Sequence, residues 1–336
     1  MKISNLFESA LSAKKINGAS VLFDGKRRDV WVFAADFDCA LQSIDSLTGA
    51  PKRVNGNFNC SHNPKLISLV DGPEEVDGNY FCSNCDLTSL KGVPKHVKGD
   101  FSCANNSHLT SLKYGPKEID GNYSCNNCSL TSLEGAPKYV KKDFFCSMNK
   151  LTTLEGGPEK VDGDYICRLN NLTSLKGAPK YVLGDFTCSG NAQLTSLEYG
   201  PEIVKEAYYC SDCNLTSLKG APKRIYSNFV CSGNAHLTSL EYGPEIIDGN
   251  YICHNNGLTS LKDIHKHVKQ INDEFELTSN NIKSHILGLL RIKNLKKVAL
   301  DNKKVEEIVN KYLPNGNILK CQSELIDAGL EEYAQM

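Results

Sequence analysis

The residues with the clearest capacity for chemistry are cysteines, of which the chain has 15 among 336 residues. Three pairs have the C-x-x-C spacing that is typical of zinc sites and of redox dithiols. These pairs are Cys82 and Cys85, Cys125 and Cys128, and Cys210 and Cys213. The elements that carry the pairs determine whether their thiols can meet, so the organisation of the chain decides between metal binding, redox chemistry and simple packing.

An internal repeat of 21 or 22 residues runs through most of the chain. A cysteine follows the repeated proline by nine residues, and an aromatic residue precedes that cysteine by two. From Phe58 onward the aromatic alternates strictly between Phe and Tyr. Such a fixed step predicts a solenoid in which each strand lies parallel to the last, about 4.8 Å away. The repeated prolines are Pro51, Pro73, Pro94, Pro116, Pro137, Pro158, Pro179, Pro201, Pro222 and Pro244.

Within one repeat the pattern reads aromatic-x-Cys-x-x-Asn-x-Leu-Thr-Ser-Leu, followed by Gly, Pro and Val. The alternation predicts a short half-buried strand, and the Gly and Pro predict turns. This pattern resembles the leucine-rich repeat L-x-x-L-x-L-x-x-N-x-L. The segment 165–172 fits it with an aromatic and a Cys in two leucine positions, and the segment 275–282 restores Leu277 and Asn280. The repeat length is similar to the short leucine-rich repeats of bacterial effectors and tailed-phage proteins.

The resemblance implies an α/β repeat solenoid over residues 36–300, with a parallel β stack of about 13 coils. We expect 13 strands in one row, eleven ending in Cys and two in Leu, and a helical return at 286–292. We expect residues 1–35 to form a small N-terminal α+β cap. Residues 301–336 predict an α-helical C-terminal cap, or alternatively a small docking domain. Caps of this kind cover the apolar ends of a solenoid.

This organisation argues against chemistry at the cysteines. The nearest C-x-x-C pairs lie two coils apart, roughly 10 Å, whereas zinc needs four sulfurs at about 2.3 Å. In the family pattern, one cysteine of each pair takes a strand position and the other takes the Asn position. We therefore expect no metal, no cofactor and no disulfides, and interpret the thiols as small buried apolar groups. The segment 161–165, Val-Asp-Gly-Asp-Tyr, lacks the nonapeptide of calcium-binding rolls and favours a turn.

No catalytic site is predicted. Some bacterial leucine-rich-repeat effectors carry a catalytic Cys in a helical domain after the repeats, but here 36 residues follow Leu300, with Cys321 as their only cysteine. The chain has no G-x-x-x-x-G-K-[ST], H-E-x-x-H or G-x-S-x-G motif. We expect a protein that is not an enzyme, and an effector-like enzyme is the third hypothesis.

The exposed side of the strand row is the candidate binding site. Side chains that flank the aromatic and the Cys must point outward, because strand side chains alternate. An apolar stripe edged by carboxylates on a concave face is typical of protein-binding surfaces; the alternative is that β-propensity alone selected these residues. The predicted face consists of Phe81, Phe145, Ile166, Tyr209, Val230 and Ile252, with Asp143, Asp164 and Asp185 at its edge.

The composition of the chain limits the classes of molecule that it is expected to bind. Lys and Arg total 38 and Asp and Glu total 39, so a net charge of −1 argues against nucleic-acid or membrane binding by bulk charge. The sequence contains no run of 18 apolar residues, so no membrane-spanning helix is predicted. The first residues lack the apolar segment of a secretory signal. We expect a cytoplasmic protein, in the host cytoplasm if it is phage-encoded, that binds another protein. The main rival is a structural component of a phage particle or other assembly.

Overall fold

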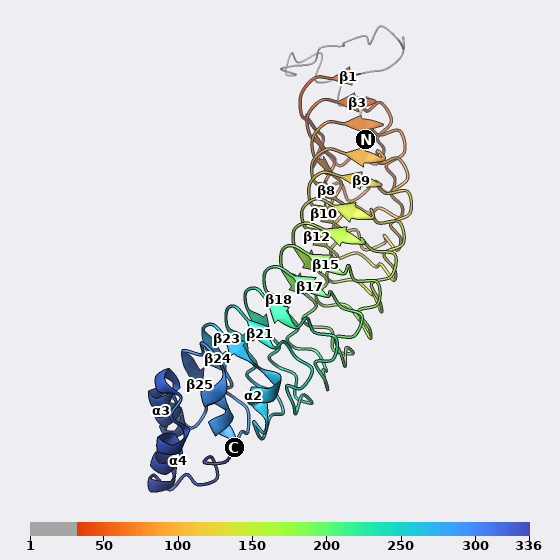
Figure 1. Ribbon diagram of the computed structural model, residues 1–336. Helices are drawn as coiled ribbons and strands as arrows, with labels where there is room; N and C mark the ends of the chain where they lie inside the picture. The colour runs from red at the N-terminus through yellow and green to blue at the C-terminus, as the bar shows by residue number, and fades with distance from the viewer. Residues whose placement is uncertain (1–31) are drawn as a thin grey trace. The chain divides into compact units, whose positions relative to one another are not determined.

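The computed structural model describes residues 32–336, which form a parallel β-solenoid of about 12 turns with few helices. Turns of about 22 residues are consistent with a leucine-rich-repeat-like protein. The chain divides into a first unit, Met1–Asn170, and a second unit, Asn171–Met336. Within each unit, successive turns stack one on another (Figure 1). Of the N-terminal cap predicted for residues 1–35, residues 1–31 lie outside the described part of the chain.

Each turn of the first unit contributes two very short strands, one to each of two parallel rows. The first row holds the aromatic residue and comprises β2 (Phe37–Asp38), β4 (Phe58–Asn59), β6 (Tyr80–Phe81), β8 (Phe101–Ser102), β10 (Tyr123–Ser124), β12 (Phe144–Phe145) and β14 (Tyr165–Ile166). The second row holds the Val or Ile that follows Pro and comprises β1 (Val32–Phe33), β3 (Arg53–Val54), β5 (Glu75–Val76), β7 (His96–Val97), β9 (Glu118–Ile119), β11 (Tyr139–Val140) and β13 (Lys160–Val161). β1 pairs in parallel with β3, so the second row begins inside the segment that the sequence assigned to the cap.

The second unit continues the same plan and adds helices. Its first row comprises β16 (Phe186–Thr187), β18 (Tyr208–Tyr209), β20 (Phe229–Val230), β22 (Tyr251–Ile252), β24 (Glu274–Glu276) and β25 (Lys297–Ala299). In its second row, β15 (Tyr181–Val182) pairs with β17 (Ile203–Val204), and a separate sheet joins β19 (Arg224–Ile225), β21 (Ile246–Ile247) and β23 (Gln270–Ile271). The helices are α2 (Ile264–His267), the 3₁₀ helix η1 (Ile286–Arg291), α3 (Lys303–Tyr312), the 3₁₀ helix η2 (Leu313–Asn315) and α4 (Ile318–Asp327).

The 13 first-row strands predicted from the sequence are confirmed, seven in the first unit and six in the second. The α/β class is not shown, because the returns between strands contain almost no helix. A turn of about 22 residues must hold two strands, the Leu-Thr-Ser-Leu segment and three tight turns. That leaves no room for a helix of ordinary length, which has about 11 residues.

Aromatic rings, thiols and leucines fill the interior. In the first unit the aromatic side chains from Phe58 to Tyr165 are 0 or 1% exposed. Neighbouring rings lie close enough to stack, with centroids 4.9 Å apart between Phe58 and Tyr80 and 5.2 Å apart between Phe144 and Tyr165. The second unit repeats this file, with centroids 4.8 Å apart at its end, between Tyr251 and Phe275.

A ladder of buried polar side chains joins neighbouring coils at the turn after the first row. The amide of Asn106 donates hydrogen bonds to the carbonyl oxygens of Cys103 (2.8 Å) and of Cys82 in the previous coil (3.0 Å). Where Cys replaces this Asn, the thiol makes the corresponding bond, as from Cys85 to the Cys60 carbonyl (3.3 Å). The second member of each C-x-x-C pair therefore serves as a ladder donor.

The alternation of Phe and Tyr is matched by a second alternation eight residues earlier, immediately before Pro. In the repeats with Tyr this residue is glycine: Gly72, Gly115, Gly157, Gly200 and Gly243. In the repeats with Phe it is larger: Ala50, Val93, Ala136, Ala178 and Ala221. A Cβ added at Gly115 would lie 3.5 Å from the Tyr123 hydroxyl and 3.0 Å from the Leu90 Cδ1 atom. The hydroxyl thus lies against the position that a methyl group takes in a Phe repeat.

Helix α3 covers the last strand of the second unit, and α4 packs on α3 and on η1. The Asn310 side chain of α3 accepts a hydrogen bond from the Val298 N–H (2.8 Å) and donates one to the Val298 carbonyl (2.9 Å). These bonds satisfy the otherwise open edge of β25. Val305, Ile308 and Val309 of the same helix are buried. α3 and α4 therefore fit the predicted C-terminal cap.

Candidate functional site

Two outward surfaces compete as a functional site, and each belongs to one row of strands. We define the first-row face as the outward residues of the first row together with the turn that follows each strand. The second-row face comprises the residues on either side of the buried Val or Ile of the second row. In both rows the alternation of two-residue strands buries one side chain and presents its neighbours to solvent.

The structure places the predicted apolar residues of the first unit on its first-row face. Phe81, Phe145 and Ile166 are each partly exposed on that face. Phe145 and Ile166 lie directly opposite one another on paired strands β12 and β14. Phe81 lies apart from them, because Ser102 and Ser124 occupy the two strands in between.

The second unit brings its own predicted residues together. Tyr209 lies opposite Val230, and Val230 lies opposite Ile252, on β18, β20 and β22. All three side chains are partly exposed. Thr187, which precedes them on β16, is only 7% exposed.

The aspartates predicted to edge the face also have a role inside the coil stack. Asp143 Oδ1 accepts the backbone N–H of Asp164 in the next coil (2.9 Å), and Asp185 Oδ1 accepts that of Ala207 (2.8 Å). The Asn122 side-chain oxygen accepts the equivalent bond from the N–H of Asp143 (3.0 Å), so an uncharged amide can serve as the acceptor at this position. The negative charge of Asp143 is therefore not needed for this bond.

The same column explains one of the recurring glycines. A Cβ at Gly121 would lie 2.2 Å from Asp100 Oδ1 of the previous coil, which is far inside contact distance. Glycine thus lets the Asp or Asn side chain fold over the backbone of the following turn.

Two apolar residues on the first-row face were not predicted from the sequence. Met148 and Leu169 stand two residues after the first-row cysteines, with φ angles of 58° and 54°, and are 51% and 50% exposed. Left-handed backbone is costly for side chains other than Gly, Asn and Asp. The signal was available, since the equivalent position holds His62, Asn84, Asn105, Asn127, Gly190, Asp212, Gly233 and Asn255 elsewhere. Leu41 is the other apolar residue there, and the outward residues beside it, Asp38 and Asn59, are polar.

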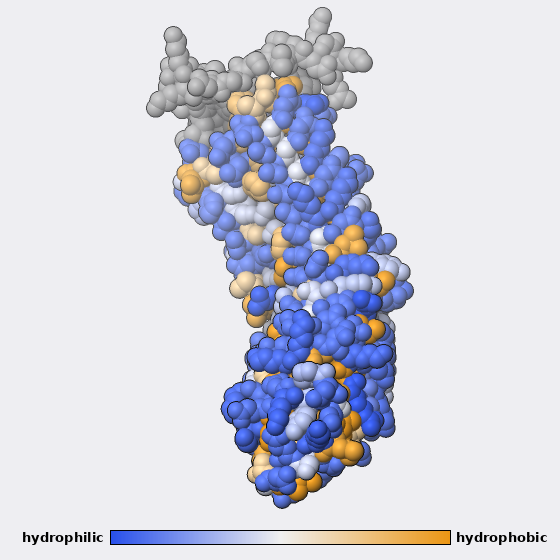
Figure 2. Space-filling model, turned by 60° about the vertical axis from the view of Figure 1, so that its left-hand side comes forward, coloured by the Kyte–Doolittle hydropathy of each residue, from blue (hydrophilic) through white to orange (hydrophobic). Residues whose placement is uncertain are grey.

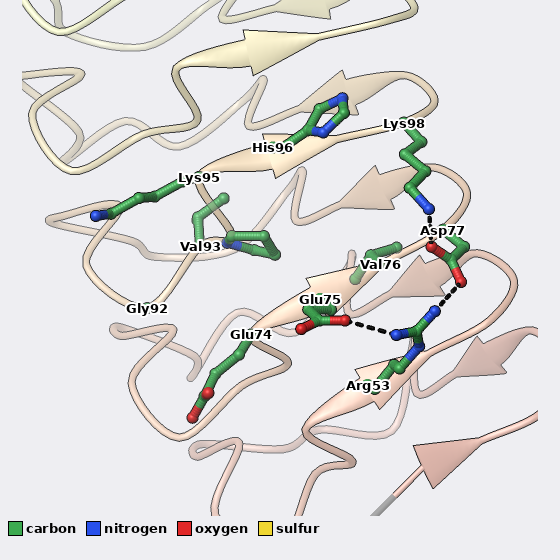
Figure 3. Close-up of a pocket in the computed structure, with 11 residues that line it drawn as sticks. Arg53, Glu74, Glu75, Val76, Asp77, Gly92, Val93, Lys95, His96 and Lys98 are labelled. Atoms are coloured by element: carbon green, nitrogen blue, oxygen red, sulfur yellow. Dashed lines mark hydrogen bonds and ion pairs between the residues drawn. The ribbon is translucent and has the colours of Figure 1, made fainter. Parts of the chain in front are cut away.

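The second-row face of the first unit is held together by ion pairs between coils. The Arg53 guanidinium contacts Glu75 Oε2 (2.8 Å) and Asp77 Oδ2 (3.0 Å), and Lys98 binds the other oxygen of Asp77 (Figure 3). The hydrogen bond from Lys98, with that from Arg53, lowers the pKa of Asp77. Each charge on this part of the face is thus shared with a neighbouring coil.

The pattern extends along the row. Asp120 is bound by Lys141 (2.7 Å) and by His96 Nε2 (3.2 Å), and the hydrogen bond from Lys141 lowers the pKa of Asp120. Asp162 accepts a hydrogen bond from the Tyr139 hydroxyl and lies 2.9 Å from Lys160 Nζ; the bond from Tyr139 lowers its pKa. Acidic and basic residues therefore neutralise one another on this face.

An open hollow of about 610 Å³ adjoins these ion pairs. Its lining includes Arg53, Asp77 and Lys98, whose charges are already matched, while Lys95 and Glu74 point away from them (Figure 3). A charged ligand that contacts Arg53, Asp77 or Lys98 would have to compete with their existing ion pairs. The hollow is therefore a weaker candidate than the first-row face.

The thiols are placed for packing. All 15 cysteines are free and buried. Burial raises the pKa of Cys60 and Cys82 well above the ordinary value and raises that of Cys39 to about 12. Cys321 is buried in α4, and burial raises its pKa to about 11. These four thiols are protonated at neutral pH and are poor nucleophiles or metal ligands. Cys128 and Cys213 differ, because side-chain hydrogen bonds from Cys103 and Cys188 lower their pKa values.

No known protein family, curated protein or solved structure matches this chain. Within residues 32–336, no three His, Cys, Asp or Glu side chains are grouped so that they could hold a metal ion. The same residues include no helix with the length and apolar character that crossing a bilayer requires.

Proposed function

We propose that this protein is a non-enzymatic protein-interaction module that binds its partner through the first-row face. One observation carries the proposal. In the first unit, the charged side chains of the second-row face pair with one another, whereas the first-row face combines partly exposed apolar residues with carboxylates that have no cation beside them among the described residues.

Asp100 and Asp143 illustrate the difference, because neither forms an ion pair with any residue from 32 to 336. Phe145 and Ile166, on the same face, leave apolar surface in contact with water. On the side shown in Figure 2 the surface is mostly polar, with apolar residues scattered among the polar ones. Apolar side chains that occur together among polar ones favour an interaction site.

The architecture supports such a role physically. The coils are fixed by backbone hydrogen bonds, buried rings and the Asn ladder, so the outward side chains are held in place before a partner arrives. A preformed surface lowers the entropy cost of ordering on binding. The finer assignment, a short leucine-rich repeat of the bacterial effector or tailed-phage type acting in the cytoplasm, is part of this proposal and is supported by the repeat length and the free thiols.

The proposal is tested by affinity purification with the full chain as bait, followed by the same experiment with single variants. Phe145→Ala, Ile166→Ala, Tyr209→Ala and Val230→Ala each remove part of the first-row face. Glu118→Gln, on the second-row face, is the matched control. We expect capture of a specific protein to weaken in at least one first-row variant and to persist in Glu118→Gln.

Unchanged capture across all four first-row variants would overturn the proposal. Co-sedimentation of the protein with assembled particles, in place of capture of a separate protein, would assign it a structural role in an assembly.

A further inference from the structure

Met148 and Leu169 contradict the local rule for the turn in which they lie. The left-handed position after each first-row strand mostly holds Asn, Asp or Gly, which tolerate positive φ. Strained positions that keep an unsuitable residue are more common at functional sites. Two neighbouring coils of the first unit keep such a residue, and both side chains are half exposed.

The outward strand residues of these two coils are also apolar, and no other two neighbouring strands of the first unit's first row both have an apolar outward residue. Phe145 and Ile166 are register partners, and the Met148 N–H donates to the Arg168 carbonyl (2.9 Å), so the two turns are adjacent as well. We define the two-coil patch as Phe145, Met148, Ile166 and Leu169. Leu41, the other apolar residue at this left-handed position, has no apolar strand neighbour on its coil.

The patch has opposite charges at its two edges. Asp143 and Asp164 precede the strands, whereas Arg168 and Lys150 lie at the turns that follow them. Among the described residues, neither Asp143 nor Arg168 nor Lys150 has an ion-pair partner. Asp164 and Arg168 are four positions apart on one coil, which corresponds to at most roughly 13 Å of extended chain, so a segment of about five residues reaches from one edge to the other.

We propose that the two-coil patch binds an extended segment of a partner protein, about five residues long, with a Lys or Arg at one end, an Asp or Glu at the other and apolar side chains between. This inference rests on the proposed function and specifies the partner's chemistry. The cation of the segment meets Asp143, its anion meets Arg168, and its apolar side chains pack on Phe145, Met148, Ile166 and Leu169.

Other classes of partner fit the patch less well. Nucleic acid and anionic membrane present a single sign of charge, which Asp143 and Asp164 repel. A large globular partner needs about 800 Å² on each side, whereas this patch has four apolar side chains on two coils. A short two-signed segment satisfies both edges at once.

The test uses the full chain and a displayed library of random 12-residue peptides. We expect enriched peptides to share a basic residue and an acidic residue separated by about three apolar or small residues. A synthetic copy of the best peptide is then titrated against the protein, alongside a copy with its basic and acidic residues exchanged. Binding should weaken at least about tenfold on the exchange.

Protein variants locate the site. The double variant Met148→Asn, Leu169→Asn restores the usual left-handed residue, so the fold should be kept while affinity falls about tenfold or more. Asp143→Asn keeps the hydrogen bond to Asp164 and should weaken binding severalfold. Leu41→Asn makes the same kind of change off the patch, and it should leave affinity unchanged.

Each contrary result has a distinct meaning. Loss of binding in Tyr209→Ala and Val230→Ala but not in the Met148, Leu169 double variant would overturn the patch and leave the proposed function standing. Absence of any enriched peptide, or enrichment of peptides of one charge sign, would overturn the partner chemistry. The protein could also bind vesicles that contain anionic lipid and lose that binding in the double variant. This result would identify the ligand of the patch as a membrane surface and overturn the peptide.

Discussion

The first and second rows of the first unit are both ladders of two-residue parallel strands, yet they treat charge in opposite ways. On the second row, Asp77 is shared between Arg53 and Lys98 on the two neighbouring coils. On the first row, Asp143 uses one oxygen for a backbone N–H and has no cation beside it within residues 32–336. Two rows with the same backbone structure can therefore present one surface whose charges are paired within the protein and another whose charges are not. The surface with unpaired charges is the one to test for a partner.

The buried interior that supports both faces should respond most strongly to mutation. Leu154 in the first unit and Leu175 in the second are 0% exposed. Either Leu→Ala change should cost roughly 2–5 kcal/mol of unfolding free energy, because it leaves a cavity in a close-packed core. Chemical denaturation measures the effect, and a loss below about 0.5 kcal/mol would contradict the assigned interior position.

The matched alternation of Gly with Tyr and of Ala with Phe predicts a coupled pair. Gly115→Ala should destabilise the protein by about 1–3 kcal/mol through overpacking, because the added Cβ would lie 3.0 Å from both the Leu112 carbonyl oxygen and the Leu90 Cδ1 atom. Adding Tyr123→Phe should recover part of the loss, because removing the hydroxyl, 3.5 Å from the added Cβ, gives the crowded side chains room to shift. A double-mutant cycle measures the coupling, and strictly additive effects would mean that the two positions do not share one space.

The ion pairs of the second-row face predict a dependence on pH. The pKa of Asp77 is lower in the folded state than its ordinary value of 3.8, so the unfolded chain binds the proton more tightly. The stabilisation is complete above that ordinary value and is lost as the pH falls through the lowered folded pKa. Asp77→Asn should cost about 0.2–1 kcal/mol at pH 7 and flatten the acid limb of the stability curve.

The same substitution on the first-row face should have the smallest effect. Asp143→Asn should change the unfolding free energy by less than about 0.5 kcal/mol at pH 7, because Asn122 already makes the equivalent bond. Equal losses from Asp77→Asn and Asp143→Asn would remove the distinction between the two faces. Denaturation of both variants in one buffer gives the comparison directly.

The repeat and its interior could be predicted because identical residues recur at a fixed step. Parallel stacking of one strand per turn follows from that step, as does a buried file of aromatic, Cys and Leu residues. The strand at 297–299, the return near 286–292 and the capping helices also follow from local apolar patterns. The second row was harder to predict, since one Val or Ile among charged neighbours gives little strand signal.

The candidate site was only partly predictable. Phe145 and Ile166 follow from strand alternation, but Met148 and Leu169 lie in turns, where sequence alone does not predict that an apolar side chain adopts positive φ and stays exposed. The second role of Asp143, as acceptor for the next coil, depends on a contact between residues 21 positions apart.

The sequence by itself determined the period, the residues that face inward and the helical end, because each follows from local alternation repeated many times. Only the tertiary structure decided which charges are neutralised, since Arg53, Asp77 and Lys98 meet across three coils and no local pattern ranks one pairing over another. Stacking brings distant residues within ion-pair distance on the second-row face. On the first-row face it leaves Asp143 and Arg168 without an ion-pair partner in the described part of the chain, and that difference directs the search for a binding partner.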